Sequence, residues 1–354
     1  MTLRPHNAHV LPRVNDLRAN RNSRLLRYKF WTGAQRCAMK PWTSAAISRE
    51  PVAILQRLFA IIGMPRSGTT WLHQRLSRHS RMVCALDRIK EVHYFDWVDI
   101  GPSDARRFSN LATSNRHAKR FARLEWHAAR IENSLAMAPG AGQRERLLEQ
   151  LRRVRNFIDR FGESDAWYAD QFAPGPGDWC LDTTPAYHKL STSGLRRMMS
   201  VATGRRFVLL LRDPYRRALS GLQHRVARHG LEFADWDAGQ QSGFCRDVVA
   251  DGYAIPHIAR ICHTIPPEEL CIVFSETMFA EPEKAVTKIL GSAGLEFEPA
   301  CMERAEAAPN PSPPIAVPPE LRRLIFDETR PMAEGVRALG LNPPQSWDEI
   351  PEGV

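Results

Sequence analysis

The chain has 354 residues, 43% of them hydrophobic, and a formal net charge of +10. This length suits one large α/β domain or two smaller ones, and the composition excludes an intrinsically disordered chain. No apolar run reaches the roughly 18 residues of a membrane helix, so we expect no integral membrane segment.

Most of the positive charge lies in residues 1–50, where ten Lys and Arg residues and two acidic residues contribute +8. This stretch lacks the apolar segment of a secretory signal peptide. We expect a basic, partly disordered N-terminal arm over 1–50, with an organelle transit peptide as the alternative, and a domain over 51–354. The seven cysteines are scattered and form no CxxC pair, which favours free thiols, no metal site and a cytoplasmic location.

The first predicted elements are a strand, a turn and a helix. Leu58–Ile62 is a buried apolar run, Gly63–Gly68 is a turn bounded by glycines, and a helix is expected from about Thr69 to His79. Met82–Ala85 is a second short strand. A helical insertion is predicted over about 103–170.

The insertion contains a clear amphipathic helix over Gln143–Phe161, with Leu147, Leu151, Val154 and Ile158 on one face. Beyond it, strands and helices alternate. This alternation predicts an α/β fold, a P-loop-type parallel sheet with helices on both faces. Later strands are expected at Trp179–Leu181, Arg205–Leu211 and Leu270–Phe274, and later helices from Pro214 to about His229, over Pro282–Leu290 and over about Glu320–Leu339.

Residues Gly63–Thr70 have the GxxxxG spacing of a phosphate-binding loop. The glycines permit a tight turn, and the backbone N–H groups and the helix N-terminus present positive charge to an anion. Nucleoside triphosphatases have Lys after the second glycine, whereas this chain has Thr69. The loop therefore suits a 5′-phosphosulfate, which needs no bridging metal, with Arg66 as its cation. A turn without a ligand is the alternative.

Two motifs resemble the sulfotransferases that use 3′-phosphoadenosine 5′-phosphosulfate (PAPS). Pro65–Leu72 is similar to their 5′-phosphosulfate loop, with Arg66 where most members have Lys. Leu211–Ser220 resembles their 3′-phosphate motif, in which an Arg at the strand end and a Ser on the next helix hold that phosphate. The resemblance covers about residues 58–300 and implies a sulfotransferase-like fold, PAPS as co-substrate and adenosine 3′,5′-bisphosphate as product. The implied cofactor contacts are Arg66, Ser67, Gly68, Thr69, Thr70, Trp71, Arg212 and Ser220. Core packing is the alternative role for Trp71.

Two further segments, Lys90–Trp97 and Thr184–Tyr187, resemble parts of the glycosaminoglycan O-sulfotransferases and their bacterial relatives. This resemblance implies an acceptor hydroxyl on a carbohydrate or glycoconjugate, while a lipid, a polyketide or a small alcohol remains open. The chain departs from the 3-O type at Thr183, where those enzymes have Lys. A late glycine-rich loop is also not evident near residues 300–320.

Sulfuryl transfer by in-line displacement requires a base for the acceptor hydroxyl and a cation at the leaving oxygen. Glu91 is the predicted base, and a surface ion pair with Lys90 is its alternative role. In an extended segment His93 shares a face with Glu91, so His93 either orients Glu91 or is the base itself. Arg66 is the predicted catalytic cation because guanidinium binds oxyanions with two hydrogen bonds.

Other polar residues have two interpretations each. Asp96 either fixes His93 or caps a helix. Tyr187 and His188 either line the acceptor pocket or pack in the core. A group of arginines on the helix that follows Arg212 is expected to form a solvated face; its members are Arg216, Arg217 and Arg225.

Two other function classes fit less well. A small-molecule kinase needs Lys at position 69 and an acidic strand end for Mg²⁺, and only Glu276 offers the latter. A basic nucleic-acid-binding protein needs basic residues interleaved with exposed aromatic residues, but here the charge is concentrated in residues 1–50. We therefore expect no nucleic-acid partner.

Overall fold

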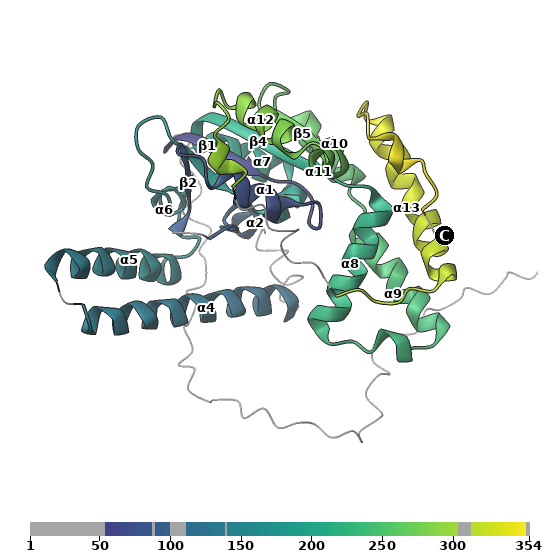
Figure 1. Ribbon diagram of the computed structural model, residues 1–354, viewed down its shortest axis with the longest axis horizontal. Coiled ribbons are helices and arrows are strands. Elements are labelled where there is room, and N and C mark those ends of the chain that lie inside the picture. The colour runs from purple at the N-terminus through teal and green to yellow at the C-terminus, as the bar shows by residue number, and fades with distance from the viewer. Residues whose placement is uncertain (1–53, 87–88, 100–110, 139, 304–312, 352–354) are drawn as a thin grey trace, which may run out of the picture. The chain divides into compact units, whose positions relative to one another are not determined.

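The computed structural model describes residues 54–86, 89–99, 111–138, 140–303 and 313–351. Residues 50–354 form one compact unit, distinct from residues 1–49. The predicted basic arm lies outside the described residues, and all the described helices and strands belong to the unit of 50–354 (Figure 1).

The core of this unit is a five-stranded sheet in the order β2-β3-β1-β4-β5, in which every pairing is parallel. The strands are β1 (Leu55–Ile61), β2 (Met82–Cys84), β3 (Trp179–Asp182), β4 (Ala202–Leu211) and β5 (Leu270–Phe274). The predicted parallel α/β sheet is thus confirmed. The C-terminal parts of β1 and β4, over Leu58–Ile61 and Phe207–Leu211, are continuous apolar and buried runs, as expected for strands covered on both faces.

The chain order of the strands creates a switch point between β1 and β4. From β1 the chain continues to β2 and β3 on one side, whereas from β4 it continues to β5 on the other. The connections that leave the carboxyl ends of β1 and β4 therefore diverge. In open α/β sheets, such a switch point is the usual place of ligand binding.

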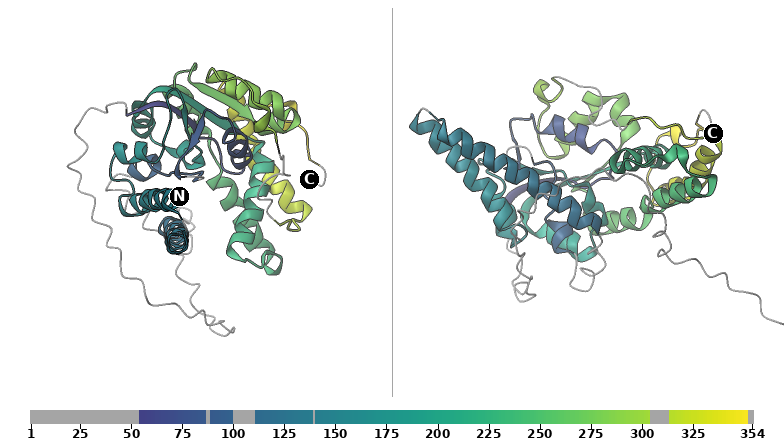
Figure 2. Two further views of the ribbon diagram at one scale, coloured as in Figure 1. Left: turned by 60° about the vertical axis from the view of Figure 1, so that its left-hand side comes forward. Right: turned by 90° about the horizontal axis from the view of Figure 1, so that it is seen from below.

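Helices lie on both faces of the sheet (Figures 1 and 2). A hydrophobic cluster packs between the sheet and the helices on each face. The smaller cluster joins alternate residues of β1 and β4 to α1 (Thr69–Leu76), α11 (Ser275–Ala280) and α12 (Pro282–Ser292). The larger one joins the opposite faces of these strands to α2 (Phe95–Val98), α6 (Asp165–Asp170), α7 (Thr192–Ser200) and α10 (Ile255–Thr264). A third cluster packs α8 (Pro214–His229) against α9 (Ala238–Asp251) and α13 (Pro319–Ala338).

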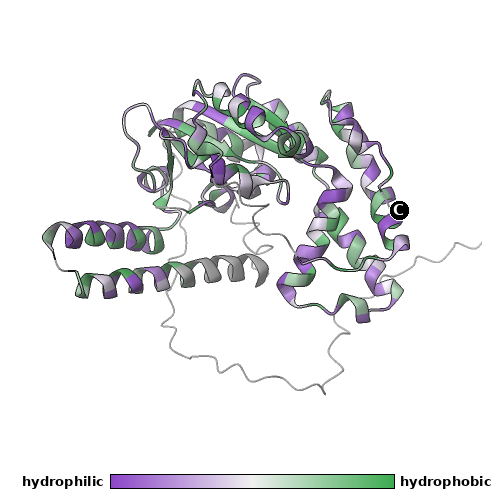
Figure 3. Cartoon of the chain, in the orientation of Figure 1, coloured by the Kyte–Doolittle hydropathy of each residue, from purple (hydrophilic) through white to green (hydrophobic). Residues whose placement is uncertain are grey.

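Helices occupy the described part of the predicted insertion. α4 (Leu111–Ala136) and α5 (Ala141–Asp159) pack against each other as a hairpin, and α6 follows (Figure 2). Val154 of the predicted apolar face is buried, while Leu147, Leu151 and Ile158 are half-buried against the core. Figure 3 shows the matching alternation of hydrophilic and hydrophobic residues along α5. Residues 100–110 lie outside the described residues.

The sequence prediction differs from the structure in some elements. α1 ends at Leu76 rather than at His79, and α7, α9, α10 and α11 were not predicted. α9 contains Gly239 and Gly243, which weaken the helical pattern. Its start nevertheless has a sequence signal, because Asp237 and Gln240 form a capping box.

A second difference between prediction and structure is a buried arginine in α8. Arg217 was expected on a solvated face, but it is 9% exposed and donates to the carbonyl oxygen of Gly252 and to Sδ of Met332. The prediction was wrong because α8 packs against both α9 and α13, so more than one of its faces is covered. Gly252 leaves room for the guanidinium, and burial lowers the pKa of Arg217 to about 10.

The six cysteines within the described residues are free thiols. Among the described helices, none combines the length and the apolar character that crossing a bilayer requires.

Candidate active site

The loop between β1 and α1 lies against the end of β4. The amides of Ile62 and Met64 continue the sheet pairing by donating to the carbonyls of Val208 and Leu210. A Cβ on Gly63 would lie 2.1 Å from the amide nitrogen of Leu210, so only glycine allows this approach. Gly68 has a φ of 87°, which also favours glycine, and it precedes the first turn of α1.

The structure brings the two predicted phosphate motifs together. The Arg212 guanidinium at the end of β4 donates to the carbonyl oxygen of Arg66 at 2.9 Å. Nε of Arg66 in turn donates to Oγ of Ser220 on α8 at 3.0 Å. The loop after β1 and the motif after β4 are therefore directly joined at the switch point of the sheet.

Two further hydrogen bonds fix this junction. Oγ of Ser275, at the start of α11, donates to the carbonyls of Ser67 and Leu211 at 2.7 and 3.0 Å. Burial lowers the pKa of both Arg66 and Arg212. The site thus holds two partly desolvated guanidinium groups close together, an arrangement that favours an anionic ligand.

The loop has features that fit a bound phosphate group. Oγ of Ser67 is fully buried and has no hydrogen-bond partner among the described residues. The first N–H groups of a helix, here those of α1 from Thr69 onward, lack partners within the helix. A phosphate or phosphosulfate oxygen would satisfy such donors.

The predicted cofactor contact Trp71 packs in the core. Its ring lies 5.4 Å from that of Phe279 and 5.2 Å from the Arg75 guanidinium carbon, and 7% of the residue is exposed. A ring this deeply buried offers little surface to an adenine base. The structure therefore favours the packing interpretation of Trp71.

Lys90 is a site residue that the sequence analysis did not identify as one. Its Nζ lies 3.3 Å and 3.0 Å from the hydroxyl oxygens of Thr69 and Thr70, and 2.9 Å from Oε1 of Glu91. The predicted ion pair with Glu91 is present, but the same ammonium also reaches the phosphate loop. Adjacent Lys and Glu residues gave no signal of this contact, because it depends on the placement of the loop.

Glu91, His93 and Asp96 form a connected triad. Nε2 of His93 lies 3.1 Å from Oε2 of Glu91, and Nδ1 of His93 lies 2.7 Å from Oδ2 of Asp96. The predicted contacts of His93 with Glu91 and Asp96 are therefore present. His93 itself has a φ of 59°, so the contact with Glu91 does not come from a regular extended segment.

The charges in this triad are set by its hydrogen bonds. Burial alone would raise the pKa of Glu91, but the hydrogen bond from His93 and the charge of Lys90 outweigh it and lower the pKa to about 2. Burial would lower the pKa of His93, but its hydrogen bonds to Asp96 and Glu91 outweigh this effect and raise the pKa to about 9. At neutral pH, Glu91 is therefore a carboxylate and His93 an imidazolium that donates to both acids.

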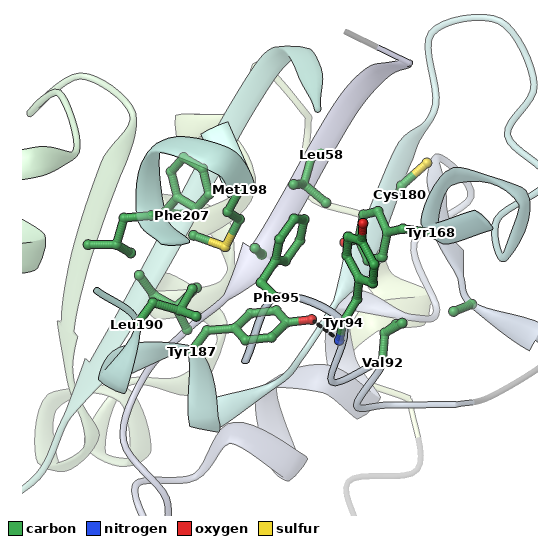
Figure 4. Close-up of a cluster of buried hydrophobic side chains, with 14 of the residues drawn as sticks. Leu58, Val92, Tyr94, Phe95, Tyr168, Cys180, Tyr187, Leu190, Met198 and Phe207 are labelled. Atoms are coloured by element: carbon green, nitrogen blue, oxygen red, sulfur yellow. Dashed lines mark hydrogen bonds between the residues drawn. The ribbon is translucent and has the colours of Figure 1, made fainter. Parts of the chain in front are cut away.

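A buried carboxylate anchors the segment that carries this triad. Asp182, at the end of β3, accepts hydrogen bonds from the hydroxyls of Thr184, Tyr168 and Tyr187, and from the amide of Val92. The hydroxyl of Tyr187 also accepts from the amide of Tyr94 (Figure 4). Burial raises the pKa of Asp182. The Thr184–Tyr187 segment thus holds the Glu91 segment in place.

The structure favours core packing for Tyr187 and His188. Tyr187 is fully buried and His188 is 3% exposed. Nδ1 of His188 contacts the carbonyl oxygen of Pro185, and burial lowers the pKa of His188 to about 3. A neutral, buried imidazole of this kind serves packing rather than substrate binding.

Thr183, where the resembled enzymes have Lys, connects α1 to the Lys90 segment. Its amide donates to the carbonyl oxygen of Lys90 at 2.9 Å, and its hydroxyl lies 3.0 Å from Nδ1 of His73. Burial, together with the charge of Lys90, lowers the pKa of His73 to about 4, so this histidine is neutral.

The fold of the chain resembles that of known sulfotransferases. A solved sulfotransferase from Alicyclobacillus acidocaldarius has a similar fold, with a TM-score of 0.53 and 15% identity over 84% of this chain and 100% of its own. The sulfotransferase domain of the Synechococcus PCC 7002 olefin synthase gives a TM-score of 0.47 and 14% identity over 84% and 98% of the two chains. A search of curated proteins finds no matching sequence. A model described as the sulfotransferase family matches residues 59–299, more than half of the chain, and the chain therefore belongs to the sulfotransferase family.

Proposed function

We propose that this sulfotransferase takes its sulfuryl group from PAPS and transfers it to an acceptor hydroxyl. The observation that carries the proposal is the position of Arg66, which links the loop after β1 to Ser220 on α8, beside Arg212. Two anion-binding motifs on adjacent strands suit a nucleotide with one phosphate group at its 5′ position and another at its 3′ position.

Each motif has a separate task in this proposal. Ser67, Thr69, Thr70 and the first turn of α1 hold the 5′-phosphosulfate, for which the unpartnered hydroxyl of Ser67 is a ready donor. Arg212 and Ser220 hold the 3′-phosphate. No bridging metal is needed, since a phosphosulfate carries less charge than a triphosphate.

Glu91 is the proposed base, which removes the proton of the acceptor hydroxyl during in-line displacement. Support comes from the charge states, because an imidazolium at His93 has no lone pair left to accept a proton. His93 is then a positioning residue that orients Glu91, and Asp96 holds His93.

The proposed acceptor is a carbohydrate or glycoconjugate hydroxyl. Its support is the resemblance of Lys90–Trp97 to segments of the glycosaminoglycan O-sulfotransferases. This proposal is tested by incubating the protein with PAPS and panels of carbohydrates, lipids and small alcohols. Sulfation of a lipid or alcohol without sulfation of any carbohydrate would contradict it.

The kinase alternative gains no support from Glu276. Its Oε1 accepts from the amide of Asp213, and its Oε2 accepts from Nε1 of Trp347. These contacts tie the start of α8 to the chain near residue 347, which supports a structural role for the carboxylate rather than metal binding.

The decisive experiment measures binding of adenosine 3′,5′-bisphosphate with and without magnesium. Wild type is expected to bind it equally in both conditions, and Arg212→Ala is expected to weaken binding by about 10- to 100-fold, because a hydrogen bond to a charged group is lost. Arg216→Ala, which removes the half-exposed arginine of the same helix, is the matched control and should have little effect. Binding that requires magnesium and ignores Arg212 would contradict the proposal.

A further inference from the structure

Lys90 lies between the proposed base and the phosphate loop. The three oxygen atoms around its Nζ are the Thr69 and Thr70 hydroxyls, at the start of α1, and Oε1 of Glu91. The Lys90 side chain is only 19% exposed. One ammonium group thus touches both the base and the loop residues that hold the donor in the proposed function.

Backbone hydrogen bonds hold the segment that carries Lys90. The amide of Thr183 donates to the carbonyl oxygen of Lys90, and the neighbouring amide of Val92 donates to the buried Asp182. The segment that carries Lys90 is therefore attached to the carboxyl end of β3. Since β3 is adjacent to β1 in the sheet, the lysine side chain reaches the loop from the side of β3.

Arg66 contacts the other side of the loop. Its Nε donates to Ser220 and its carbonyl oxygen accepts from Arg212, and both partners follow β4. The loop therefore has a guanidinium on the β4 side, near the 3′-phosphate motif, and an ammonium on the side of Thr69, Thr70 and the base.

We propose that Lys90 is the catalytic cation at the leaving oxygen, a role that the sequence assigned to Arg66. This inference rests on the proposed function. During transfer, the acceptor oxygen bonds to sulfur while the bond between sulfur and the 5′-phosphate oxygen breaks. The electron pair of that bond stays on the phosphate oxygen, and the acceptor proton passes to Glu91. The Lys90 ammonium donates a hydrogen bond to the phosphate oxygen as its negative charge develops.

The position of Lys90 also couples the donor to the base. In the free protein, Lys90 helps to lower the pKa of Glu91. A phosphosulfate at Thr69 and Thr70 competes with Glu91 for the same ammonium. Donor binding therefore weakens the ion pair between Lys90 and Glu91. Glu91 thus becomes a stronger base when the sulfuryl donor is bound.

The test compares the affinities of two ligands that differ at the leaving oxygen. In PAPS this oxygen bridges phosphorus and sulfur in a mixed anhydride, whereas in adenosine 3′,5′-bisphosphate it carries the developed charge. Lys90→Met keeps the length of the side chain without its charge. It is expected to weaken binding of the bisphosphate about tenfold more than binding of PAPS. Lys90→Arg should restore part of this difference. The release of bisphosphate from PAPS, with water as acceptor, should slow by about 10²- to 10³-fold in Lys90→Met.

Two control variants separate the possible roles. Arg212→Ala should weaken the binding of both ligands alike, since both carry the 3′-phosphate. Lys284→Met removes a strongly exposed lysine paired with Glu281 and should change neither affinity. Thermal unfolding checks that each variant is folded, and Lys90→Gln replaces Lys90→Met if that variant is not.

The outcomes distinguish this inference from the proposed function. An unchanged ratio of the two affinities in a folded Lys90 variant overturns the role of Lys90. The same conclusion follows if raising the pH restores the release rate of Lys90→Met, because Lys90 would then act only by keeping Glu91 ionised. A wild-type protein that binds neither ligand overturns the proposed function itself.

Discussion

At the scale of single residues, the triad divides one task between three side chains. In the proposed mechanism Glu91 accepts the proton, and His93 orients Glu91 through their hydrogen bond. Glu91→Gln removes the basic oxygen but keeps the size of the side chain. Turnover of PAPS should fall by about 10²- to 10⁴-fold. The affinity for adenosine 3′,5′-bisphosphate should not fall and should rise somewhat, because Glu91 no longer competes with the phosphate for Lys90. Isotope-labelled PAPS and equilibrium binding measure the two quantities, and turnover that survives would transfer the role of base to His93.

The raised pKa of His93 gives a second prediction, on stability. A group that binds its proton more tightly in the folded state stabilises that state below its unfolded pKa, here 6.5, and loses this effect as the pH rises through about 9. His93→Gln should therefore cost most stability at or below neutral pH and progressively less above it. Denaturant unfolding at several pH values measures the difference.

His127→Gln, at an exposed position of α4, is the control for this series. It should leave the free energy of unfolding nearly unchanged at every pH. A stability difference that grows as the pH rises would mean that His93 is neutral in the folded protein. It would then be able to act as a base, and the division of roles within the triad would be wrong.

At the scale of secondary structure, the sequence predicts elements best where burial and capping agree. β5 and the Phe207–Leu211 part of β4 are continuous apolar runs, as expected where helices cover both faces of the sheet. α8 was predicted from Pro214 to about His229, and its observed bounds match, because Asp213 caps its start and Gly230 ends it with a φ of 59°. α7 and α10 have no comparably clear boundaries in the sequence between stronger signals.

The contacts of the site follow a similar division. The loop glycines and Arg212 belong to local motifs. The spacing of the glycines indicated the loop, and the resemblance of Leu211–Ser220 to the 3′-phosphate motif indicated Arg212. Lys90 reaches Thr70 only because β3 lies next to β1, and Arg66 reaches Ser220 only because β4 lies on the other side. Such contacts depend on strand order, which a single sequence does not specify. The support of the Glu91 segment by Asp182 was missed for the same reason.

At the scale of the whole molecule, the catalytic and core residues lie together in the unit of 50–354. Every predicted cofactor contact, the triad and the three hydrophobic clusters belong to it. Most of the net positive charge lies instead in residues 1–50. The cations that we assign to the nucleotide are individual residues of the site, namely Arg66, Lys90 and Arg212, and not this charged segment.

Removal of residues 1–49 should therefore lower the net positive charge without changing stability or nucleotide binding. The shortened chain is expected to unfold at the same temperature and to bind adenosine 3′,5′-bisphosphate with the same affinity, while binding much less tightly to a cation exchanger. Calorimetry and ion-exchange retention measure these effects. The full chain at raised salt is the control, because salt screens long-range attraction but preserves direct contacts at a partly buried site. If truncation weakened nucleotide binding and high salt did not, residues 1–49 would contribute direct contacts to the site. The two phosphate-binding motifs would then not be the whole nucleotide-binding site.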